Sequence, residues 1–510
     1  MPVAVIRVDS SLKIGSGHLM RCLTLANELR RFNWQCHFIC MDTSDNGRET
    51  VIAAGHSLHL LEVDAVSKKY RHDDSVVNVE FEAKDASKVI AVISPLSCDL
   101  LIVDHYGLGV VWESALEKFC NSIFVIDDLA SRNHICNILL DQTYGRTIAS
   151  YGERVANGTR IICGSDFALL RPEFTGYRSE SLRKREQCQN PKNIFISLGG
   201  ADPGNLTLAI LKNIAISSNE KEVILAVSSN FPGLRRLRKY QETVTWLRIE
   251  CDVKNMAEHM LWADLAIGSG GVTSWERCCM GLPSVVIQIA NNQASVIKAL
   301  EMKGAAIVIE EPSDIPSAIL RLIDTSTYQD MAKKAFSLCD GLGVTRVVKH
   351  LIMLKESNVS LKPITIDDAV LVFQWQHEEG IRKYFRVKEP PIWEQHLRWL
   401  YSRLEGPDQK CWMINLWDMP AGIIRLDRLY GETFEVSILI SNEYQSLGLA
   451  KKALLDLQSN SENLGELVAE VNINNTVSIS LFVSCGFKRK SDDQYYWSAN
   501  RQKEVGDAKV

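Results

Sequence analysis

The stretch Gly268-Ser-Gly-Gly-Val-Thr-Ser-Trp-Glu276 follows an apolar run that ends at Ile267. Residues 277–280 after it are compatible with a helix, which the sequence Gly281-Leu-Pro283 then ends. A buried strand, a glycine loop with hydroxyl side chains and the start of a helix, in this order, predict one βα unit of an open parallel sheet. The stretch therefore indicates an α/β fold.

Strands and helices of the same kind alternate on both sides of this unit. Short apolar runs typical of buried parallel strands occur at residues 3–8, 36–41, 99–104, 122–127, 193–198, 222–227, 261–267, 283–289 and 306–309. Apolar residues at helical spacing predict helices at 18–31 and 344–355. The polar residues 178–193 predict a linker. We therefore expect two Rossmann-type domains, 1–177 and 193–355, with a cleft between them.

The sequence changes in character after residue 355. A helix-rich stretch comes first, and alternation typical of antiparallel strands follows at residues 412–417, 421–428 and 434–440. A third domain, of the α+β class, is therefore predicted over residues 361–498.

The composition of the 510 residues, 46% hydrophobic and 23% charged, is that of an ordinary globular protein. The 57 basic and 62 acidic residues give a net charge of -5, so we expect neither nucleic acid nor an anionic membrane as a partner. No run reaches the roughly 18 apolar residues that cross a bilayer, and the first residues lack the features of a signal peptide. The sequence contains 14 cysteines but no C-x-x-C pair, and it contains no D-x-D motif. We expect a cytoplasmic enzyme with reduced thiols and no metal, and the oligomeric state stays open.

A second glycine loop, Gly15-Ser16-Gly17-His18, joins the first predicted strand to the first predicted helix. Glycines at this junction let the backbone approach a ligand closely. The positive end of the helix dipole disfavours a protonated imidazole, so His18 is expected to stay neutral and to accept a proton, as a general base must. A glycine-rich turn with a histidine at the helix start, without chemistry, is an equally good interpretation of this motif alone.

The loop at residues 268–276 fits a diphosphate, because backbone N–H groups at a helix start bind anions. It lacks the Gly-Lys-Ser/Thr ending of a Walker loop. Glu276 lies one turn inside the predicted helix, where its carboxylate reaches the hydroxyls of a ribose. Together with Ser197-Leu-Gly-Gly-Ala-Asp-Pro203, these loops make residues 1–355 resemble the family of UDP-2,4-diacetamido-2,4,6-trideoxy-β-L-altropyranose hydrolases of pseudaminic acid biosynthesis, which have a GT-B-like pair of domains.

This resemblance implies roles for individual residues. His18 would activate water at the anomeric carbon, and Glu276 would bind the ribose. The diphosphate would lie at Gly270, Gly271, Thr273 and Ser274, and the remaining implied substrate contacts are Gly17, Asp104, Tyr106, Asn292 and Gln293. Asp104 falls at the C-terminal end of a predicted parallel strand, where ligand crevices form, although helix capping is an alternative for it.

In the third region, a predicted strand at 434–440 precedes the sequence Tyr444-Gln-Ser-Leu-Gly-Leu-Ala450 and a helix. This Q-x-x-G-x-A pattern, with Asn474-Asn475 and Gly486-Phe487 downstream, resembles the GNAT family of N-acetyltransferases. The resemblance implies acetyl-CoA as co-substrate and a splayed strand that polarises the thioester carbonyl. The implied contacts to acetyl-CoA are Ile438, Leu439, Ile440, Gln445, Ser446, Gly448, Ala450 and Asn475. Many members have a tyrosine acid where this chain has Phe482, so the acid is unassigned: water, Tyr444 or no group at all serves.

The sequence thus predicts a bifunctional enzyme that acetylates the 4-amino group of UDP-4-amino-4,6-dideoxy-N-acetyl-β-L-altrosamine and then releases UDP by hydrolysis. Two alternatives stay open. One is a GT-B glycosyltransferase, which needs an acceptor, with an appended acetyltransferase. In the other, the last domain only binds acetyl-CoA or the nucleotide sugar and has no chemistry of its own.

Overall fold

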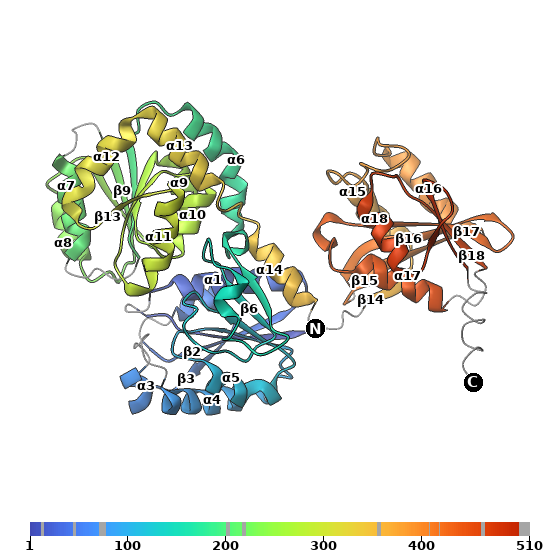
Figure 1. The fold of residues 1–510 in the computed structure, drawn as a ribbon, viewed down its shortest axis with the longest axis horizontal. Coiled ribbons are helices and arrows are strands. Elements are labelled where there is room, and N and C mark those ends of the chain that lie inside the picture. The colour runs from blue at the N-terminus through green and yellow to red at the C-terminus, as the bar shows by residue number, and fades with distance from the viewer. Residues whose placement is uncertain are drawn as a thin grey trace. The chain divides into compact units, whose positions relative to one another are not determined.

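A computed structural model describes residues 1–11, 15–43, 47–70, 78–199, 205–216, 221–353, 359–406, 408–417, 419–460 and 465–498. The chain forms two compact units, Met1–Leu354 and Lys355–Val510. The first unit contains two parallel sheets and the second contains one mostly antiparallel sheet, as Figure 1 shows. No helix among the described residues is both long and apolar enough to cross a membrane.

The N-terminal sheet has seven parallel strands in the order β3-β2-β1-β4-β5-β6-β7. Their bounds are Ser57–Leu61, Gln35–Met41, Val3–Val8, Leu100–Asp104, Ile123–Ile126, Ile138–Asp141 and Arg160–Cys163. Helices α4 (Val79–Ile93) and α5 (Val110–Leu116) pack their apolar side chains on one face of this sheet. Chain order reverses between β1 and β4, and a ligand crevice forms at such a switch point.

The second sheet has six parallel strands in the order β10-β9-β8-β11-β12-β13. Their bounds are Leu247–Cys251, Glu222–Val227, Asn193–Ser197, Leu265–Gly268, Ser284–Ile287 and Ile307–Ile309. Helices α6 (Pro172–Gln187), α9 (Met256–Trp262), α10 (Thr273–Cys279), α11 (Ala294–Lys303) and α13 (Thr325–Phe336) pack on one face, and α7 (Leu206–Ile216), α8 (Leu234–Gln241) and α12 (Ile315–Ile323) pack on the other. Here the switch point lies between β8 and β11, so the glycine loop after β11 borders it.

Two sequence predictions were wrong in detail. The predicted linker at 178–193 is mostly the second half of helix α6. The helix lacks an apolar periodicity because polar side chains anchor it: Ser181 donates to the carbonyl of Met280, and Arg178 donates to the carbonyl of Cys279. The predicted strand at 261–267 begins only at Leu265, because α9 extends to Trp262.

The predicted helix at 344–355 is α14 (Gly343–Ile352), and it packs against the N-terminal domain. Thr345 on α14 donates a hydrogen bond to Glu28 on helix α1 (Gly17–Arg31) at 2.9 Å. A Cβ on Gly343 would lie 2.3 Å from the carbonyl oxygen of Ala168, so only glycine allows this close approach. The last helix of the first unit therefore packs on the N-terminal domain, although it follows the second sheet in the chain.

The second unit is built on a seven-stranded sheet in the order β14-β15-β16-β17-β18-β20-β19. The strand bounds are Val359–Pro363, Gln409–Leu416, Met419–Tyr430, Thr433–Ile440, Glu466–Glu470, Gln494–Ser498 and Lys488–Arg489. The helices α15 (Ala369–Gln376), α16 (Trp393–Glu405), α17 (Leu449–Asn460) and α18 (Thr476–Ser484) surround it. Neighbouring strands are antiparallel except β17 and β18, which run parallel.

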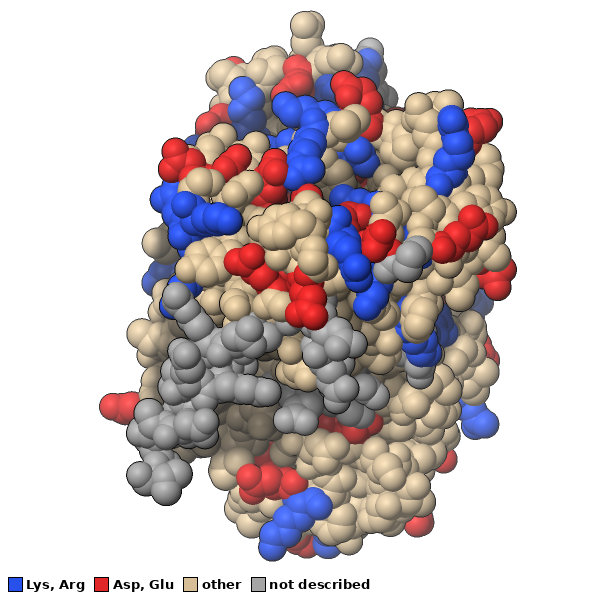
Figure 2. Space-filling view, turned by 90° about the vertical axis from the view of Figure 1, so that its right-hand side faces the viewer, with Lys and Arg blue, Asp and Glu red and all other residues tan. Residues whose placement is uncertain are grey.

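The space-filling view in Figure 2 shows basic and acidic side chains interspersed on one face. Among the described residues drawn there, neither sign of charge covers a continuous track.

Candidate functional site

The imidazole of His18 lies in the first turn of α1 and contacts the end of strand β4. Its Nδ1 is 2.6 Å from Oδ1 of Asp104, and the His18 side chain is only 13% exposed. Because a carboxylate accepts a hydrogen bond, this short contact favours the tautomer with hydrogen on Nδ1 over one in which Nδ1 accepts from Nη2 of Arg21, which is 3.2 Å away. No described residue hydrogen-bonds to Nε2, which leaves that nitrogen able to accept a proton from a ligand.

Arg21, one helical turn after His18, holds the same carboxylate. Its Nε donates to Oδ2 of Asp104 at 2.6 Å, and its Nη1 donates to Asp128 at 2.6 Å. Burial alone would raise the pKa of Asp104, but the charge of Arg21 and the contact with His18 lower it well below its usual range. Asp104 is thus an anion that orients His18. Both of its carboxylate oxygens have partners within the protein. The resemblance in sequence instead implies that Asp104 contacts the substrate.

Tyr106 closes one side of the imidazole. The two rings meet edge to face with their centroids 4.8 Å apart, and the Tyr106 hydroxyl is 3.4 Å from Asp128. The sequence predicts His18, Asp104 and Tyr106 as site residues, whereas Arg21 and Asp128 are not among its predictions. The signal for Arg21 was its spacing of three residues from His18, which places both on one face of the helix.

The loop that carries His18 lies against the glycine loop of the second sheet. A Cβ on Gly17 would be 3.6 Å from the side chain of Val272, so the two loops are neighbours across the switch points of the two sheets. The structure therefore brings together two motifs that are about 250 residues apart in the sequence. This placement is that of a binding cleft between two domains.

The glycine loop is shaped by α11 beneath it. A Cβ on Gly270 would lie 2.4 Å from Ile297, whereas a Cβ on Gly271 would meet only Ser269, at 3.8 Å. Gln293 accepts hydrogen bonds from the backbone N–H groups of Gly270 at 3.3 Å and Ile289 at 3.1 Å. Gly270 and Gln293 thus fix the shape of the loop, and Gly271 leaves open space beside it.

Two side chains near this loop have buried oxygen atoms without a partner among the described residues. They are Oε2 of Glu276 and Oδ1 of Asn292. The other oxygen of Glu276 is 3.4 Å from Arg171, and burial raises the pKa of Glu276. A buried acceptor without a donor is costly, so both atoms fit a ligand that supplies hydroxyl or N–H groups.

Two of the three hydroxyl residues of the loop, Thr273 and Ser274, are held from inside by Arg277, which the sequence predicts only as part of the helix. Arg277 donates to Oγ1 of Thr273 at 3.2 Å and to Oγ of Ser274 at 3.1 Å. Ser274 is 1% exposed and is 3.3 Å from the carbonyl oxygen of Ser269. Ser274 is therefore a buried part of the loop, and its hydroxyl does not face the solvent.

The second unit contains a separate candidate site where β17 and β18 part. In the described residues, the pairing of these strands is confined to Thr433–Glu435 on β17 and residues 466–468 on β18. Beyond Glu435, β17 stays paired with β16 as far as Ile440. Ile438, Leu439 and Ile440 therefore lie on a strand with one backbone edge not taken up by β18, which is the splayed geometry expected there.

The loop after β17 has an unusual backbone. Ser446 and Gly448 both have positive φ, 68° and 71°, and nothing lies within 4 Å of a Cβ built on Gly448. Gln445 donates to the carbonyl oxygen of Ile440 at 3.1 Å and so ties the loop to the strand. Ala450 follows in the first turn of α17. This open turn next to the free strand edge fits the pyrophosphate of acetyl-CoA.

Asn475 and two aromatic residues have structural roles. The Asn475 side chain accepts from the N–H of Ser478 at 3.2 Å and caps α18, which occupies its oxygen. Phe482 packs in the core with its ring centroid 5.0 Å from that of Phe487. The Tyr444 hydroxyl is 4.0 Å from the sulfur of Met419. Phe482 has no acidic proton, so the acid of the predicted acetyl transfer is not this residue.

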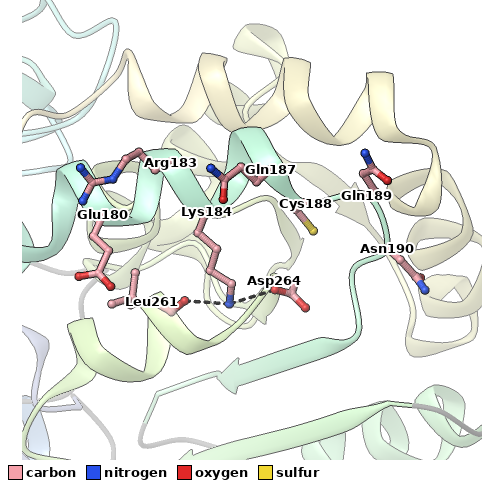
Figure 3. A pocket seen from close by; sticks show the side chains of 9 residues that line it. All are labelled: Glu180, Arg183, Lys184, Gln187, Cys188, Gln189, Asn190, Leu261 and Asp264. Carbon is pink, nitrogen blue, oxygen red and sulfur yellow. Dashed lines mark hydrogen bonds and ion pairs between the residues drawn. The ribbon is translucent and has the colours of Figure 1, made fainter.

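A surface groove of about 600 Å³ lies elsewhere in the first unit, along α6. Figure 3 shows Lys184 reaching from α6 toward Leu261 and Asp264. Its Nζ donates to the carbonyl of Leu261 at 3.0 Å and to Oδ1 of Asp264 at 3.0 Å. These contacts cap the C-terminal end of α9, so the groove has a structural explanation and does not include His18 or the glycine loop.

Residues 358–488 match the family model described as an acetyltransferase (GNAT) domain. An uncharacterized protein of Methanocaldococcus jannaschii is 27% identical over 512 residues, which cover 96% of this chain and 97% of that protein. The UDP-2,4-diacetamido-2,4,6-trideoxy-beta-L-altropyranose hydrolase of Campylobacter jejuni is 26% identical over 300 residues, 59% of this chain and 96% of that protein.

The crystal structure of MurG from Acinetobacter baumannii shares the fold of the first unit, with a TM-score of 0.50, 14% identity and coverage of 69% of this chain and 99% of that one. The predicted fold class is confirmed: a GT-B-like pair of Rossmann-type domains precedes a GNAT acetyltransferase domain. The predicted resemblance to the hydrolase family, fused to a GNAT domain, is confirmed as well. The similarity to the Methanocaldococcus jannaschii protein extends over both units, because it covers 96% of this chain.

Proposed function

We propose that this chain is a bifunctional enzyme acting on a UDP-linked amino sugar. The C-terminal domain transfers an acetyl group to the 4-amino group of UDP-4-amino-4,6-dideoxy-N-acetyl-β-L-altrosamine. The first unit then hydrolyses UDP-2,4-diacetamido-2,4,6-trideoxy-β-L-altrose to UDP and the free sugar. The observation that carries the proposal is the His18–Asp104 pair, with Nε2 left available, beside the glycine loop.

In the hydrolytic step, Nε2 of His18 accepts a proton from water as the water oxygen bonds to the anomeric carbon. The bond between that carbon and the diphosphate oxygen breaks, and UDP leaves with the electron pair. Asp104 holds the imidazole in the required tautomer and stabilises the imidazolium that forms. The open side of Gly271 and the Thr273 hydroxyl would receive the diphosphate, and the unpaired oxygen of Glu276 would accept from the ribose.

In the acetylation step, the substrate amine attacks the thioester carbonyl, and the thiolate of coenzyme A leaves. Acetyl-CoA supplies the acetyl thioester. The unpaired edge of β17 at residues 438–440 would donate backbone hydrogen bonds to it, and the turn at Gln445, Ser446 and Gly448 would hold its pyrophosphate. A thiolate with a pKa of about 8 to 9 leaves without an acid, which is compatible with Phe482 in place of a tyrosine.

The two activities support each other because the acetylated product is the substrate of the hydrolytic step. The membership of residues 358–488 in an acetyltransferase family and the likeness of the first unit to a UDP-sugar hydrolase support this pairing. We propose domain limits of 1–177, 193–355 and 361–498 for the three domains, and α6 (Pro172–Gln187) runs across the limit at residue 177. We further propose that the enzyme acts in the cytoplasm.

An NMR time course tests the proposal directly. The protein is incubated with UDP-4-amino-4,6-dideoxy-N-acetyl-β-L-altrosamine, with and without acetyl-CoA, and the N-acetyl methyl and anomeric signals are followed. We expect UDP and free diacetamido sugar only when acetyl-CoA is present, and we expect His18→Ala to stop at the acetylated nucleotide sugar. Acetylation without UDP release in water would favour a glycosyltransferase that awaits an acceptor, and binding of acetyl-CoA without turnover would favour a binding domain. Absence of both reactions would refute the proposed substrate.

A further inference from the structure

A positive charge lies buried directly under the glycine loop. Arg277 on α10 is 3% exposed, and its Nη2 donates to the carbonyl oxygen of Ser269 at 2.8 Å. The same guanidinium donates to the side-chain oxygens of Thr273 and Ser274. All three of its acceptors therefore belong to the loop or to the first turn after it.

Arg277 forms no ion pair with a carboxylate of any described residue. Its neighbour Glu276 pairs with Arg171 instead, at 3.4 Å. Arg21, which is buried to a similar degree in the first domain, pairs with Asp104 and Asp128. A buried charge without an ion-pair partner is energetically costly, and burial lowers the pKa of Arg277 to about 10, although Cys278 and Glu276 nearby oppose this.

A second buried arginine without a carboxylate shows by contrast what is special about Arg277. Arg185 donates to Oγ of Ser181 and to two carbonyls, those of Met260 and Ala263 at the end of α9, where the backbone presents negative partial charge. Arg277 has one carbonyl and two hydroxyl oxygens as partners, so its charge is less well compensated. An anion at the loop would complete the compensation.

The loop sequence makes room for this side chain. A Cβ on Gly268 would lie 2.3 Å from Nη1 of Arg277, so only glycine at this position admits the guanidinium. The first glycine of the motif therefore has a role that differs from that of Gly271, beside which the space is open. The guanidinium of Arg277 can therefore take this position only while residue 268 has no side chain.

The hydrogen bonds of Arg277 also set the direction of a hydroxyl group. Because a guanidinium only donates, it uses a lone pair of Thr273 Oγ1, and the Thr273 O–H is left to donate to something else. No described residue accepts from that hydroxyl. A phosphate oxygen is a suitable acceptor beside the open space at Gly271.

We propose that Arg277 is a positioning residue for the diphosphate of the nucleotide: it is the buried counter-charge of the loop, and it turns the Thr273 hydroxyl toward the anion. This inference rests on the proposed function, because it assigns the diphosphate to this loop. It predicts that Arg277 contributes to recognition of the phosphates and not to recognition of uridine.

Calorimetric titration of the full-length protein with UDP, uridine and inorganic pyrophosphate tests this inference. Loss of a charge-assisted contact corresponds to roughly tenfold in affinity. We expect Arg277→Gln to weaken binding of UDP and pyrophosphate by at least about tenfold and to change uridine binding by less than about twofold. Arg277→Lys keeps the charge, so its affinity for UDP and pyrophosphate should lie between those of wild type and Arg277→Gln. Arg321→Gln, at an exposed arginine of α12, is the matched control and should bind as wild type.

Gly268→Ala should also weaken binding of UDP and pyrophosphate, because the added methyl group displaces the guanidinium of Arg277 without removing its charge. A thermal melt of each variant checks that it is folded. An equal loss of UDP and uridine binding in Arg277→Gln would show a purely structural role and overturn the inference, as would unchanged UDP binding.

The inference and the proposed function fail in different ways. If wild type binds UDP and Arg277→Gln binds it equally well, only the role of Arg277 is lost. If wild type binds pyrophosphate in an Arg277-dependent manner but does not bind UDP more tightly, the role of Arg277 as a counter-charge is supported and UDP is refuted as the nucleotide. If wild type binds neither, both are refuted.

Discussion

Asp104 determines what the imidazole of His18 does. The carboxylate accepts from Nδ1 and is itself fixed by Arg21, so the ring keeps one orientation and one tautomer. An asparagine at this position would be neutral, and its amide would offer a donor to Nδ1 as readily as an acceptor. The proton-accepting nitrogen would then no longer face the ligand consistently.

We therefore expect Asp104→Asn to slow UDP release by about 10² to 10⁴-fold, the usual contribution of a general base, while acetyl transfer is unchanged. The two rates are measured separately, with the acetylated nucleotide sugar for hydrolysis and with the amino sugar for acetylation. Asp166→Asn, at an exposed aspartate of the same unit, is the control. Wild-type hydrolysis in Asp104→Asn would show that His18 works without its carboxylate.

Asp141, at the end of β6, predicts a pH dependence of stability. Burial, and then the nearby charge of Asp128, raises the pKa of Asp141 to about 6, although Arg146 opposes this. The native state therefore binds a proton more tightly than the unfolded chain, in which an aspartate has a pKa of about 3.9. This group stabilises the fold more as the pH falls through 6 toward 4.

As the pH falls from 7.5 to 5, the melting temperature of wild type should rise relative to that of Asp141→Asn. The lowered pKa of Asp104 acts in the opposite direction, but its contribution is lost only below the unfolded pKa and is constant in this range. Parallel melting curves for both proteins from pH 7.5 to pH 5 would contradict the prediction. Scanning calorimetry at half-unit pH steps is sufficient.

At the level of single residues, the sequence was informative where a motif carried the signal. His18 and Glu276 follow from the glycine loops beside them. The spacing of Arg21 from His18 places both on one helix face, but the sequence does not show the partners of Arg21, because Asp104 and Asp128 are 83 and 107 positions away from it. Arg277 was missed because a charged residue in a short amphipathic stretch is usually assigned to the surface.

Among the elements, α6 shows why an apolar pattern is not required for a buried helix face. Arg178 donates to the carbonyls of Cys279 and Cys339 at 2.7 and 2.5 Å, and its guanidinium lies 3.4 Å above the ring of Phe336. These contacts stabilise the second half of α6 against the second sheet, where the helix lacks the apolar side chains that Phe174 and Tyr177 supply in its first half. The strands were predictable because their apolar runs are continuous, as buried parallel strands require.

We expect Arg178→Ala to destabilise this part of the first unit by about 2 kcal/mol, since it removes hydrogen bonds from a charged donor and leaves buried carbonyls unpaired. Hydrogen exchange of peptides from α6 and α10, measured in native buffer, reports the local opening. Arg183→Ala changes an exposed arginine of the same helix and should leave exchange unchanged. Equal exchange in the two variants would mean that α6 is held in another way.

For the whole molecule, the division into two compact units has a functional consequence. Each unit has its own core, and every residue that we assign to hydrolysis lies in Met1–Leu354 while every residue that we assign to acetylation lies in Lys355–Val510. The two steps should therefore fail independently. Gly448→Val places a branched side chain at a φ of 71° in the open turn after β17 and should abolish acetylation alone.

An equimolar mixture of His18→Ala and Gly448→Val tests this independence. Neither variant alone should convert the amino sugar and acetyl-CoA to free diacetamido sugar, because the first stops after acetylation and the second stops before it. The mixture should release the free sugar after a lag, during which the acetylated intermediate leaves one molecule and enters another. Gly431→Val, at a hairpin glycine with a φ of 50° and open space around it, controls for backbone strain. If the mixture stays inactive while each variant retains its own step, the intermediate does not leave the molecule that makes it, and the two units act as one.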